Sequence, residues 1–208
     1  ALSLVESGQT ISFPQGSSQI ILAESTWENI KSQCEDYLTI HHSQYYLRRG
    51  LPREELRSKL NINNELFQGI IGKLEANGLL VQDGTDIRLK THSPTLSAED
   101  QRLSTNYLDR LNDNPNTPPT DIFLDTEILN YLSNNKKVVI VGSGIVYSRI
   151  AYDEQINEVL NYMKTHGTIS VGEARDLLGA SRKYILPFLE SMDELRLTRR
   201  SGDDRILE

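Results

Sequence analysis

The chain has little of what disulfide bonding, zinc binding or membrane insertion requires. Its 208 residues include one cysteine, Cys34, which can form neither an internal disulfide nor a thiolate zinc site and which fits a reducing compartment. No apolar run approaches the roughly 20 residues that span a bilayer, and no basic segment followed by an apolar one opens the sequence. We therefore expect a cytoplasmic protein without a membrane or secretory segment.

Catalytic motifs are also scarce. The four histidines have no carboxylate or cysteine partners at metal-ligand spacing; they are His41, His42, His92 and His166. There is no Gly-x-x-x-x-Gly-Lys-Ser/Thr phosphate loop and no Gly-x-Ser-x-Gly elbow. Gly142-Ser143-Gly144 lies between two strand-like runs, not between a strand and a helix. We expect no enzymatic activity, no metal and no cofactor.

Cations are outnumbered by anions, since 22 Lys and Arg residues stand against 29 Asp and Glu residues and the formal net charge is -7. A protein that repels polyanions over most of its surface gains little from general counterion release. Any contact with nucleic acid must therefore be local.

A unit recurs along the chain: an amphipathic helix, a strand, a glycine turn and a second strand. In the clearest copy, Asn63 or Asn64 caps a helix that Asn77-Gly78 ends. Two apolar runs, 79–81 and 87–89, then flank a turn, which is typical of a β-hairpin. The turn glycines recur at intervals of about 60 to 70 residues and are Gly16, Gly84, Gly144 and Gly202.

Each later copy also opens on a longer helix, expected at Thr26–Tyr45, Ala98–Leu111 and Asp153–His166. A shorter helix follows at Pro52–Leu60 and Val171–Leu178, whereas the corresponding segment of the third copy, Pro118–Phe123, has a weak pattern. Three helices with a terminal hairpin describe a winged helix. The expected fold is mostly α with small β-hairpins (α+β), as tandem winged-helix modules in an extended array.

The repeat predicts four segments. Residues 1–24 are the C-terminal remnant of a first winged helix. We expect this remnant to contain a helix end near Leu4–Gly8 and strands at 10–13 and 19–23. The second, third and fourth winged helices are residues 25–92, 93–150 and 151–208.

Two connections between the segments differ in length. Lys90–Leu96 has the proline and polar content of a hinge, and Ser97 can cap the next helix. Only Arg149–Tyr152 separates the third and fourth modules, so we expect a rigid pair there.

The fourth segment carries a basic cluster. Ser181 as N-cap places Arg182, Lys183 and Tyr184 in the first turn of a helix, where free N–H groups and the helix dipole attract phosphate. Cations are unfavourable for the helix start itself, which indicates a ligand, although a solvated helix start is the alternative. Tyr184 either stacks on an unpaired base or packs into the core, and packing is favoured.

The wing adds Arg199, Arg200 and Arg205, with Arg200 and Arg205 nearly opposite each other on the ribbon. Like charges so placed repel unless an anion or a carboxylate separates them, and Asp203 and Asp204 are candidate partners within the chain.

Other cations are weaker candidates. The secondary nucleic-acid contacts that we predict are Arg175, Lys136 and Lys137. The arginines and lysine between Arg48 and Lys59 interleave with Glu54 and Glu55, which favours a solvated face. The sequence assigns no role to Pro187, which stands inside the last predicted helix.

Three segments carry a family resemblance. Thr168–Tyr184 (TISVGEARDLLGASRKY) and Thr198–Leu207 (TRRSGDDRIL) closely resemble the last winged helix of the bacterial selenocysteine-specific elongation factor, the SelB family. Gly50–Arg57 (GLPREELR) resembles the second winged helix of that family. The chain is thus similar to the C-terminal extension of four winged helices, which in the family follows an elongation-factor-like GTPase part.

The resemblance implies a function. In the family, the extension holds the selenocysteine insertion hairpin (SECIS) of the mRNA, so the factor is tethered for UGA recoding. It implies that the hairpin contacts Ser181, Arg182 and Lys183 on the helix and Arg199, Arg200 and Arg205 on the wing. GTP and magnesium would belong to the GTPase part, and selenocysteinyl-tRNA would bind only through domains that this chain lacks. The ribosome is a further candidate partner. We expect a monomer.

Two other functions fit the same fold. A winged-helix transcription regulator would bind duplex DNA through its recognition helix and usually dimerise. A protein-scaffolding array would touch no nucleic acid, so replacing the basic cluster would leave its partner binding intact.

Overall fold

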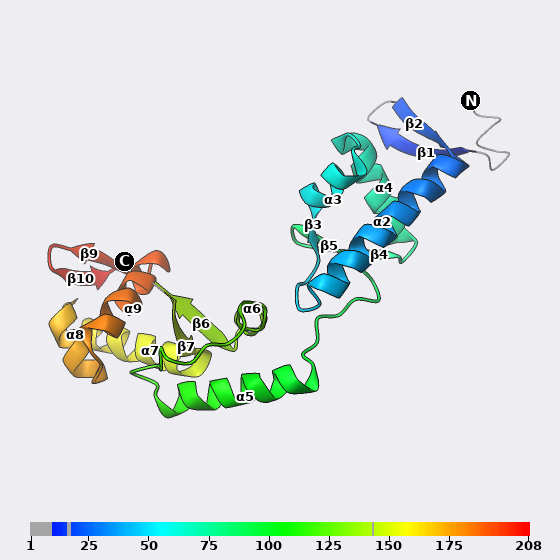
Figure 1. Ribbon diagram of the computed structural model, residues 1–208. Helices are drawn as coiled ribbons and strands as arrows, with labels where there is room; N and C mark the ends of the chain where they lie inside the picture. The colour runs from blue at the N-terminus through cyan, green and yellow to red at the C-terminus, as the bar shows by residue number, and fades with distance from the viewer. Residues whose placement is uncertain (1–9, 16–17, 143) are drawn as a thin grey trace. The chain divides into compact units, whose positions relative to one another are not determined.

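The computed structural model describes residues 10–15, 18–142 and 144–208 (Figure 1). The chain divides into two compact units, Ala1–Thr95 and Leu96–Glu208. The helix end predicted near Leu4–Gly8 and the turn residue Gly16 lie outside the described residues. The four predicted segments remain an interpretation, with the first two falling in unit 1 and nearly all of the last two in unit 2.

Over its described residues, unit 1 combines three helices with two small antiparallel sheets, and Figure 1 shows their arrangement. A first hairpin pairs Thr10 with Ala23 through Gln15 with Ser18. The second sheet has the strand order β3-β5-β4. The elements are β1 (Thr10–Gln15), β2 (Ser18–Ala23), α2 (Glu24–Gln44), β3 (Leu51–Pro52), α3 (Arg53–Leu60), α4 (Asn64–Ala76), β4 (Leu80–Asp83) and β5 (Asp86–Leu89).

Helix α4 follows the sequence prediction closely. The Asn63 side chain accepts a hydrogen bond of 2.9 Å from the backbone N–H of Leu66, which settles the cap between the two asparagines. Gly78 has a φ of 73° just after the helix, a conformation that favours glycine. The apolar face of α4 is fully buried in the unit's core, together with Phe13 of β1. The predicted remnant hairpin is therefore part of this core.

Three histidines gather where α2 meets the end of β5. The rings of His42 and His92 stack with centroids 3.7 Å apart, and His41 lies 5.9 Å from His42. The backbone N–H of Leu89 donates to Nε2 of His42, at 3.2 Å. The neutral ring therefore carries its proton on the buried Nδ1, which has no hydrogen-bond partner among the described residues. Burial, followed by the nearby His92, lowers the pKa of His42 to about 4.

This pKa predicts acid sensitivity of unit 1. Protonation would place an N–H on Nε2 of His42, where it would face the Leu89 N–H in place of an acceptor. The folded state therefore disfavours the protonated ring. Above pH 6.5 the ring is neutral in both states; as the pH falls from about 6.5 toward 4, the unfolded chain takes up the proton first and stability is lost. Allowing for water access, we expect a loss of about 1 to 2 kcal/mol at the acid end.

The fluorescence of Trp27, the single tryptophan, can report urea unfolding of unit 1 at pH 7.5 and pH 5. His42→Gln should flatten the difference, since Gln keeps an acceptor for Leu89, whereas the matched change of exposed His166 to Gln should not. Equal pH dependence in both variants would contradict this role for His42.

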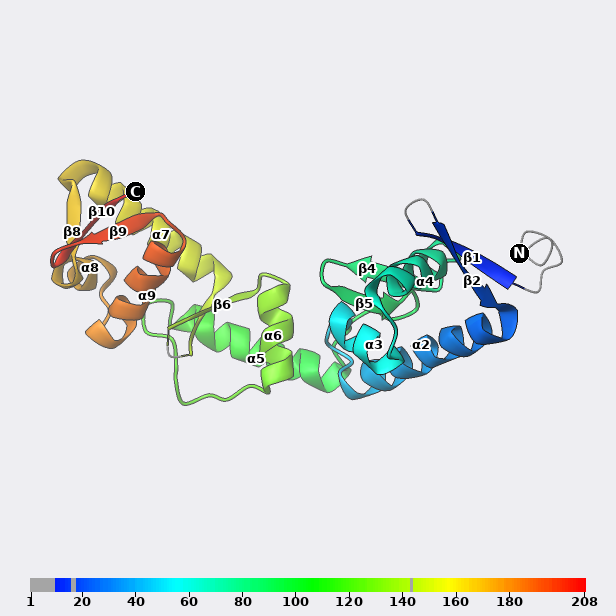
Figure 2. The same cartoon turned by 90° about the horizontal axis from the view of Figure 1, so that it is seen from above.

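Unit 2 contains the remaining two copies of the repeat (Figure 2). Its elements are α5 (Ala98–Asp113), α6 (Thr126–Asn134), β6 (Val138–Val141), β7 (Ile145–Ser148), α7 (Arg149–His166), β8 (Thr168–Ser170), α8 (Val171–Leu178), α9 (Arg182–Glu194), β9 (Thr198–Ser201) and β10 (Asp204–Leu207). Strands β6 and β7 form a two-stranded sheet, and β8, β10 and β9 form a three-stranded one in that order. Ser97 caps α5 through a capping box with Asp100.

One prediction for unit 2 is wrong. Arg149–Tyr152 is not a connection but the first turn of α7, because the Ser148 side chain caps the helix by accepting from the Ala151 N–H at 3.3 Å. The boundary predicted after residue 150 therefore falls inside a helix. The weak segment Pro118–Phe123 forms no helix and instead connects α5 to α6.

The two copies in unit 2 share a core. Val141, Ile145 and Tyr147 of the β6–β7 wing are buried in the same apolar cluster as α7, α8 and α9. At the wing turn, a Cβ on Gly142 would lie 2.7 Å from Cβ of Pro187 in α9. Pro187, to which the sequence assigned no role, thus packs against the backbone of the preceding wing.

The helices give no sign of a membrane span: none that falls within the described ranges combines the length and the apolar character required to cross a bilayer.

Candidate nucleic-acid interface

Helix α9 starts as the sequence predicts, with one difference. Ser181 is the N-cap residue, and its carbonyl accepts hydrogen bonds from the N–H groups of Tyr184 and Ile185 at 3.0 and 3.1 Å. Its side chain, however, makes no capping hydrogen bond, so the hydroxyl is free for another partner. Ser181, Arg182 and Lys183 are exposed. The start of the helix therefore lies at the surface beside two cations, an arrangement that attracts anions.

Tyr184, the third residue of α9, lies on the side of the helix that packs against the core. Its half-buried ring packs against the apolar core of unit 2, and its carbonyl accepts a hydrogen bond from the Tyr147 hydroxyl at 3.4 Å. The ammonium of Lys183 sits 5.2 Å from the centroid of the Tyr184 ring. Packing, the interpretation favoured from the sequence, accounts for the ring without an RNA base.

The wing presents two arginines to solvent. Arg200 pairs with Arg205 and Arg199 with Ile206 across β9 and β10, as the hairpin pattern predicts. Nε of Arg200 donates to the Gly202 carbonyl at 2.9 Å, which holds the guanidinium over the turn. Arg199 is exposed, and within the part of the chain that is described it has no hydrogen bond or ion pair.

Arg205 differs from its exposed neighbours because it is buried and has a partner within the chain, and its contact with RNA remains a prediction. Only 3% of the residue is exposed, and its Nε donates to Oδ2 of Asp193 in α9 at 3.0 Å. Oδ1 of Asp193 accepts from the buried Thr198 hydroxyl at 2.6 Å. The partner is therefore neither Asp203 nor Asp204. Through Asp193, the Arg205 guanidinium of β10 and the Thr198 hydroxyl of β9 are both joined to α9.

A groove brings two of the exposed cations, Arg182 and Arg200, together with the start of α8. It has a volume of about 390 Å³, and Arg182 and Arg200 line it from the helix and the wing. Acidic side chains also border it, which restricts where an anion can sit. The lining residues are Ser170, Val171, Gly172, Arg182, Leu186, Glu190, Arg200, Asp203 and Arg205.

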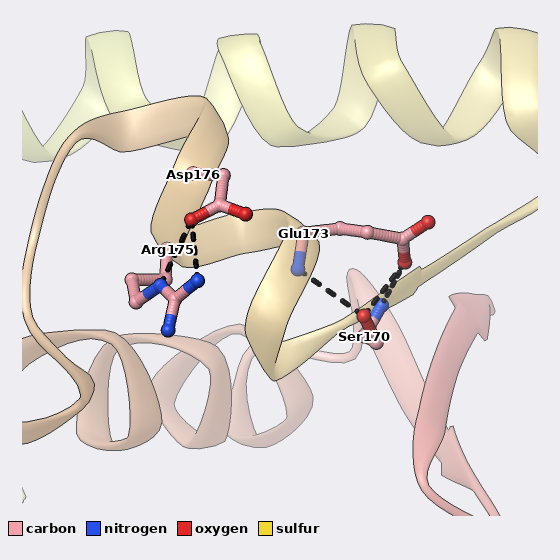
Figure 3. A network of polar contacts seen from close by, with 4 residues as sticks. All are labelled: Ser170, Glu173, Arg175 and Asp176. Carbon is pink, nitrogen blue, oxygen red and sulfur yellow. Dashed lines mark hydrogen bonds and ion pairs between the residues drawn. The ribbon is translucent and has the colours of Figure 1, made fainter.

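The start of α8 is firmly capped (Figure 3). The Ser170 N–H and hydroxyl both donate to Glu173 Oε2 at 2.7 Å, and the Glu173 N–H donates back to the Ser170 hydroxyl at 3.2 Å. The backbone and side-chain hydrogen bonds from Ser170 lower the pKa of Glu173. This capping box keeps one wall of the groove in place.

The secondary candidates stand apart from the groove. Arg175 donates from Nε and from a terminal nitrogen to the Asp176 carboxylate, at 2.9 and 2.7 Å (Figure 3). Lys136 and Lys137 are exposed in the turn between α6 and β6. Arg175 has an internal partner, and none of the three lines the groove. Their contact with nucleic acid remains a prediction.

No metal or redox centre emerges from the part of the chain that is described. No three His, Cys, Asp or Glu side chains in it are grouped as metal ligands. Cys34 is fully buried, and burial followed by the charge of Glu35 raises the pKa of its thiol to about 12, so it is not a reactive thiolate.

The sequence did not identify Asp193 or Thr120 as parts of this region. The Thr120 hydroxyl accepts a hydrogen bond of 3.0 Å from Nζ of Lys183. The two residues are 63 positions apart, and no local pattern pairs residues at that distance.

Comparisons with known proteins agree on a family. A family model described as an elongation factor SelB winged helix matches residues 161–207, and a second with the same description matches residues 36–89. The selenocysteine-specific elongation factor of Desulfomicrobium baculatum is 25% identical over 190 residues, which cover 86% of this chain and 30% of that protein. The chain therefore spans less than a third of the length of this curated relative.

One solved structure is similar to this chain in fold, and a second aligns with it more distantly. The crystal structure of a bacterial selenocysteine-specific elongation factor, EF-Sec, is similar over 96% of this chain and 32% of its own, with a TM-score of 0.50 and 22% identity. The mRNA-binding domain of elongation factor SelB from E. coli, solved in complex with SECIS RNA, aligns with 89% of this chain and 98% of its own, with a TM-score of 0.29 and 13% identity.

Proposed function

We propose that the chain is the RNA-binding part of a selenocysteine-specific elongation factor, because two of its segments match models of the SelB winged helix. It binds the selenocysteine insertion hairpin of mRNA through its last winged helix. In this way it tethers the factor to the message for UGA recoding in the cytoplasm. GTP hydrolysis with magnesium, and the binding of selenocysteinyl-tRNA, are assigned to other domains of such factors.

The observation that carries the proposal is the basic cluster at the start of α9 and on β9. Ser181, Arg182 and Lys183 are exposed at a helix start, and Arg199 and Arg200 are exposed on the adjacent wing. On a chain with a net charge of -7, this local cluster favours a specific anionic partner over general polyanion binding.

The shape of the cluster suits an RNA hairpin. A-form RNA has a deep, narrow major groove that side chains cannot read, so proteins recognise hairpins through loop and bulged bases and the flanking phosphates. A helix start and a wing can reach these features together. Arg205 supports the interface from beneath, because its pairing with Asp193 holds the wing against α9.

A titration at physiological salt tests the proposal. The chain is mixed with a selenocysteine insertion hairpin, with a scrambled hairpin of equal length, and with duplex DNA. We expect the insertion hairpin to bind at least tenfold more tightly than either alternative, as base readout adds to phosphate contacts. Preference for duplex DNA would favour a transcription regulator, and no binding to any of the three would favour a protein scaffold.

A further inference from the structure

A second cavity in unit 2 is lined by Lys183, which also belongs to the basic cluster. Its volume is about 430 Å³, and its walls come from the connection between α5 and α6, from the start of β7 and from α9. Most of the lining is apolar. The lining residues are Tyr107, Pro119, Thr120, Ile122, Phe123, Leu124, Leu129, Gly144, Ile145, Val146, Lys183 and Pro187.

Phe123 lines this cavity and is exposed to solvent. The residue is 92% exposed, more than any other large hydrophobic residue in the described ranges. Ile122 and Leu124, on either side, are partly buried against the small core between α5 and α6. The backbone is therefore anchored on both sides of Phe123, which keeps the phenyl ring at the surface.

The cavity also has a cation at its edge. Lys183 lines it and donates from Nζ to the Thr120 hydroxyl at 3.0 Å, so the ammonium is held between the connection and α9. The same lysine belongs to the basic cluster proposed to meet RNA. Asp121 is exposed next to Thr120 but does not line the cavity.

The two walls are held together. Pro187 of α9 packs against the backbone at Gly142, where a Cβ would come within 2.7 Å of it. The Tyr147 hydroxyl of β7 donates to the Tyr184 carbonyl of α9 at 3.4 Å. The wing and α9 sides of the cavity are therefore joined by direct contacts within unit 2.

From this arrangement, and on the basis of the proposed function, we infer that the cavity binds one unpaired nucleotide of the RNA hairpin. The base stacks on the Phe123 ring, as unpaired bases stack on aromatic side chains. Its phosphate pairs with Lys183. An apolar wall with a cation at its edge matches a nucleotide, whose flat base is joined to an anion, better than it matches an apolar peptide, which needs no cation.

The experiment uses the full chain and a set of hairpins in which 2-aminopurine replaces one unpaired base at a time. At saturation, we expect one position to lose fluorescence through stacking. Phe123→Ala should abolish that change and weaken hairpin binding on the order of tenfold, whereas Phe123→Trp should retain it. Ile150→Ala is the control, since Ile150 is 67% exposed and does not line the cavity.

The outcomes separate the two proposals. Tight hairpin binding that Phe123→Ala leaves unchanged would overturn the nucleotide site and leave the proposed function standing, whereas absence of hairpin binding by the wild-type chain would overturn both. Sedimentation of the chain without RNA completes the test. A dimer that Phe123→Ala dissociates would assign the cavity to contact between copies and would also overturn the nucleotide site.

Discussion

Replacing Asp193 with alanine is expected to lower the free energy of unfolding of unit 2 by about 2 to 4 kcal/mol. Its carboxylate is the partner of Arg205, whose side chain is 4% exposed, and of the fully buried Thr198 hydroxyl. The variant leaves a buried charge and a buried hydroxyl without an acceptor, and both are costly. The partial exposure of Asp193 itself, 25%, reduces the expected loss.

Urea unfolding followed by near-ultraviolet circular dichroism of the tyrosines measures the loss, with Trp27 fluorescence reporting unit 1 as an internal reference. Asp176→Ala is the matched control, because its ion pair with Arg175 is exposed and such pairs contribute about 0 to 1 kcal/mol. The Asp193 variant should also bind the hairpin more weakly, since Thr198 begins the strand that carries Arg199 and Arg200. Equal stability of the two variants would contradict the anchoring role.

Much of the fold follows from local sequence pattern. The α4 face, the cap at Asn63 and the glycine after the helix all depend on residues within one or two turns of each other, and the structure confirms them. The order of helix and hairpin was likewise readable, because apolar spacing and turn glycines are local features. The SelB winged-helix matches at residues 36–89 and 161–207 confirm the fold class.

Features that depend on distant residues were not predictable in the same way. The hairpin pattern placed Arg205 opposite Arg200 correctly, but it could not show that the side chain turns under the wing to Asp193, 12 residues earlier. Pro187 had no visible role because its contact, the backbone at Gly142, lies in the preceding copy.

The start of α7, which the sequence analysis placed too late, does have a local signal in the sequence. Ser148 precedes the first turn of α7 and caps it, and serine at this position is a common helix start. The apolar spacing becomes periodic only at Asp153, so spacing alone predicts a connection over the four preceding residues. For locating the start of this helix, the serine cap residue is therefore a better indicator than the onset of periodic apolar spacing.

The central claim is that exposed cations of the last winged helix hold the RNA, and the double variant Arg182→Ala/Arg199→Ala tests it most directly. Both side chains are exposed and, in the described ranges, have no internal hydrogen bond or ion pair, so the variant should fold normally. We expect the hairpin Kd to rise about 10- to 100-fold at physiological salt, and the dependence of log K on log salt to become shallower by about 2.

The control is Lys31→Ala/Arg102→Ala, which removes the same charge from α2 and α5, where both side chains form exposed ion pairs. The measurement is the hairpin affinity of the wild-type chain and of both double variants across a series of salt concentrations. The account predicts a large loss and a shallower salt dependence for Arg182→Ala/Arg199→Ala alone. Equal losses in the two double variants, or none in either, would contradict it.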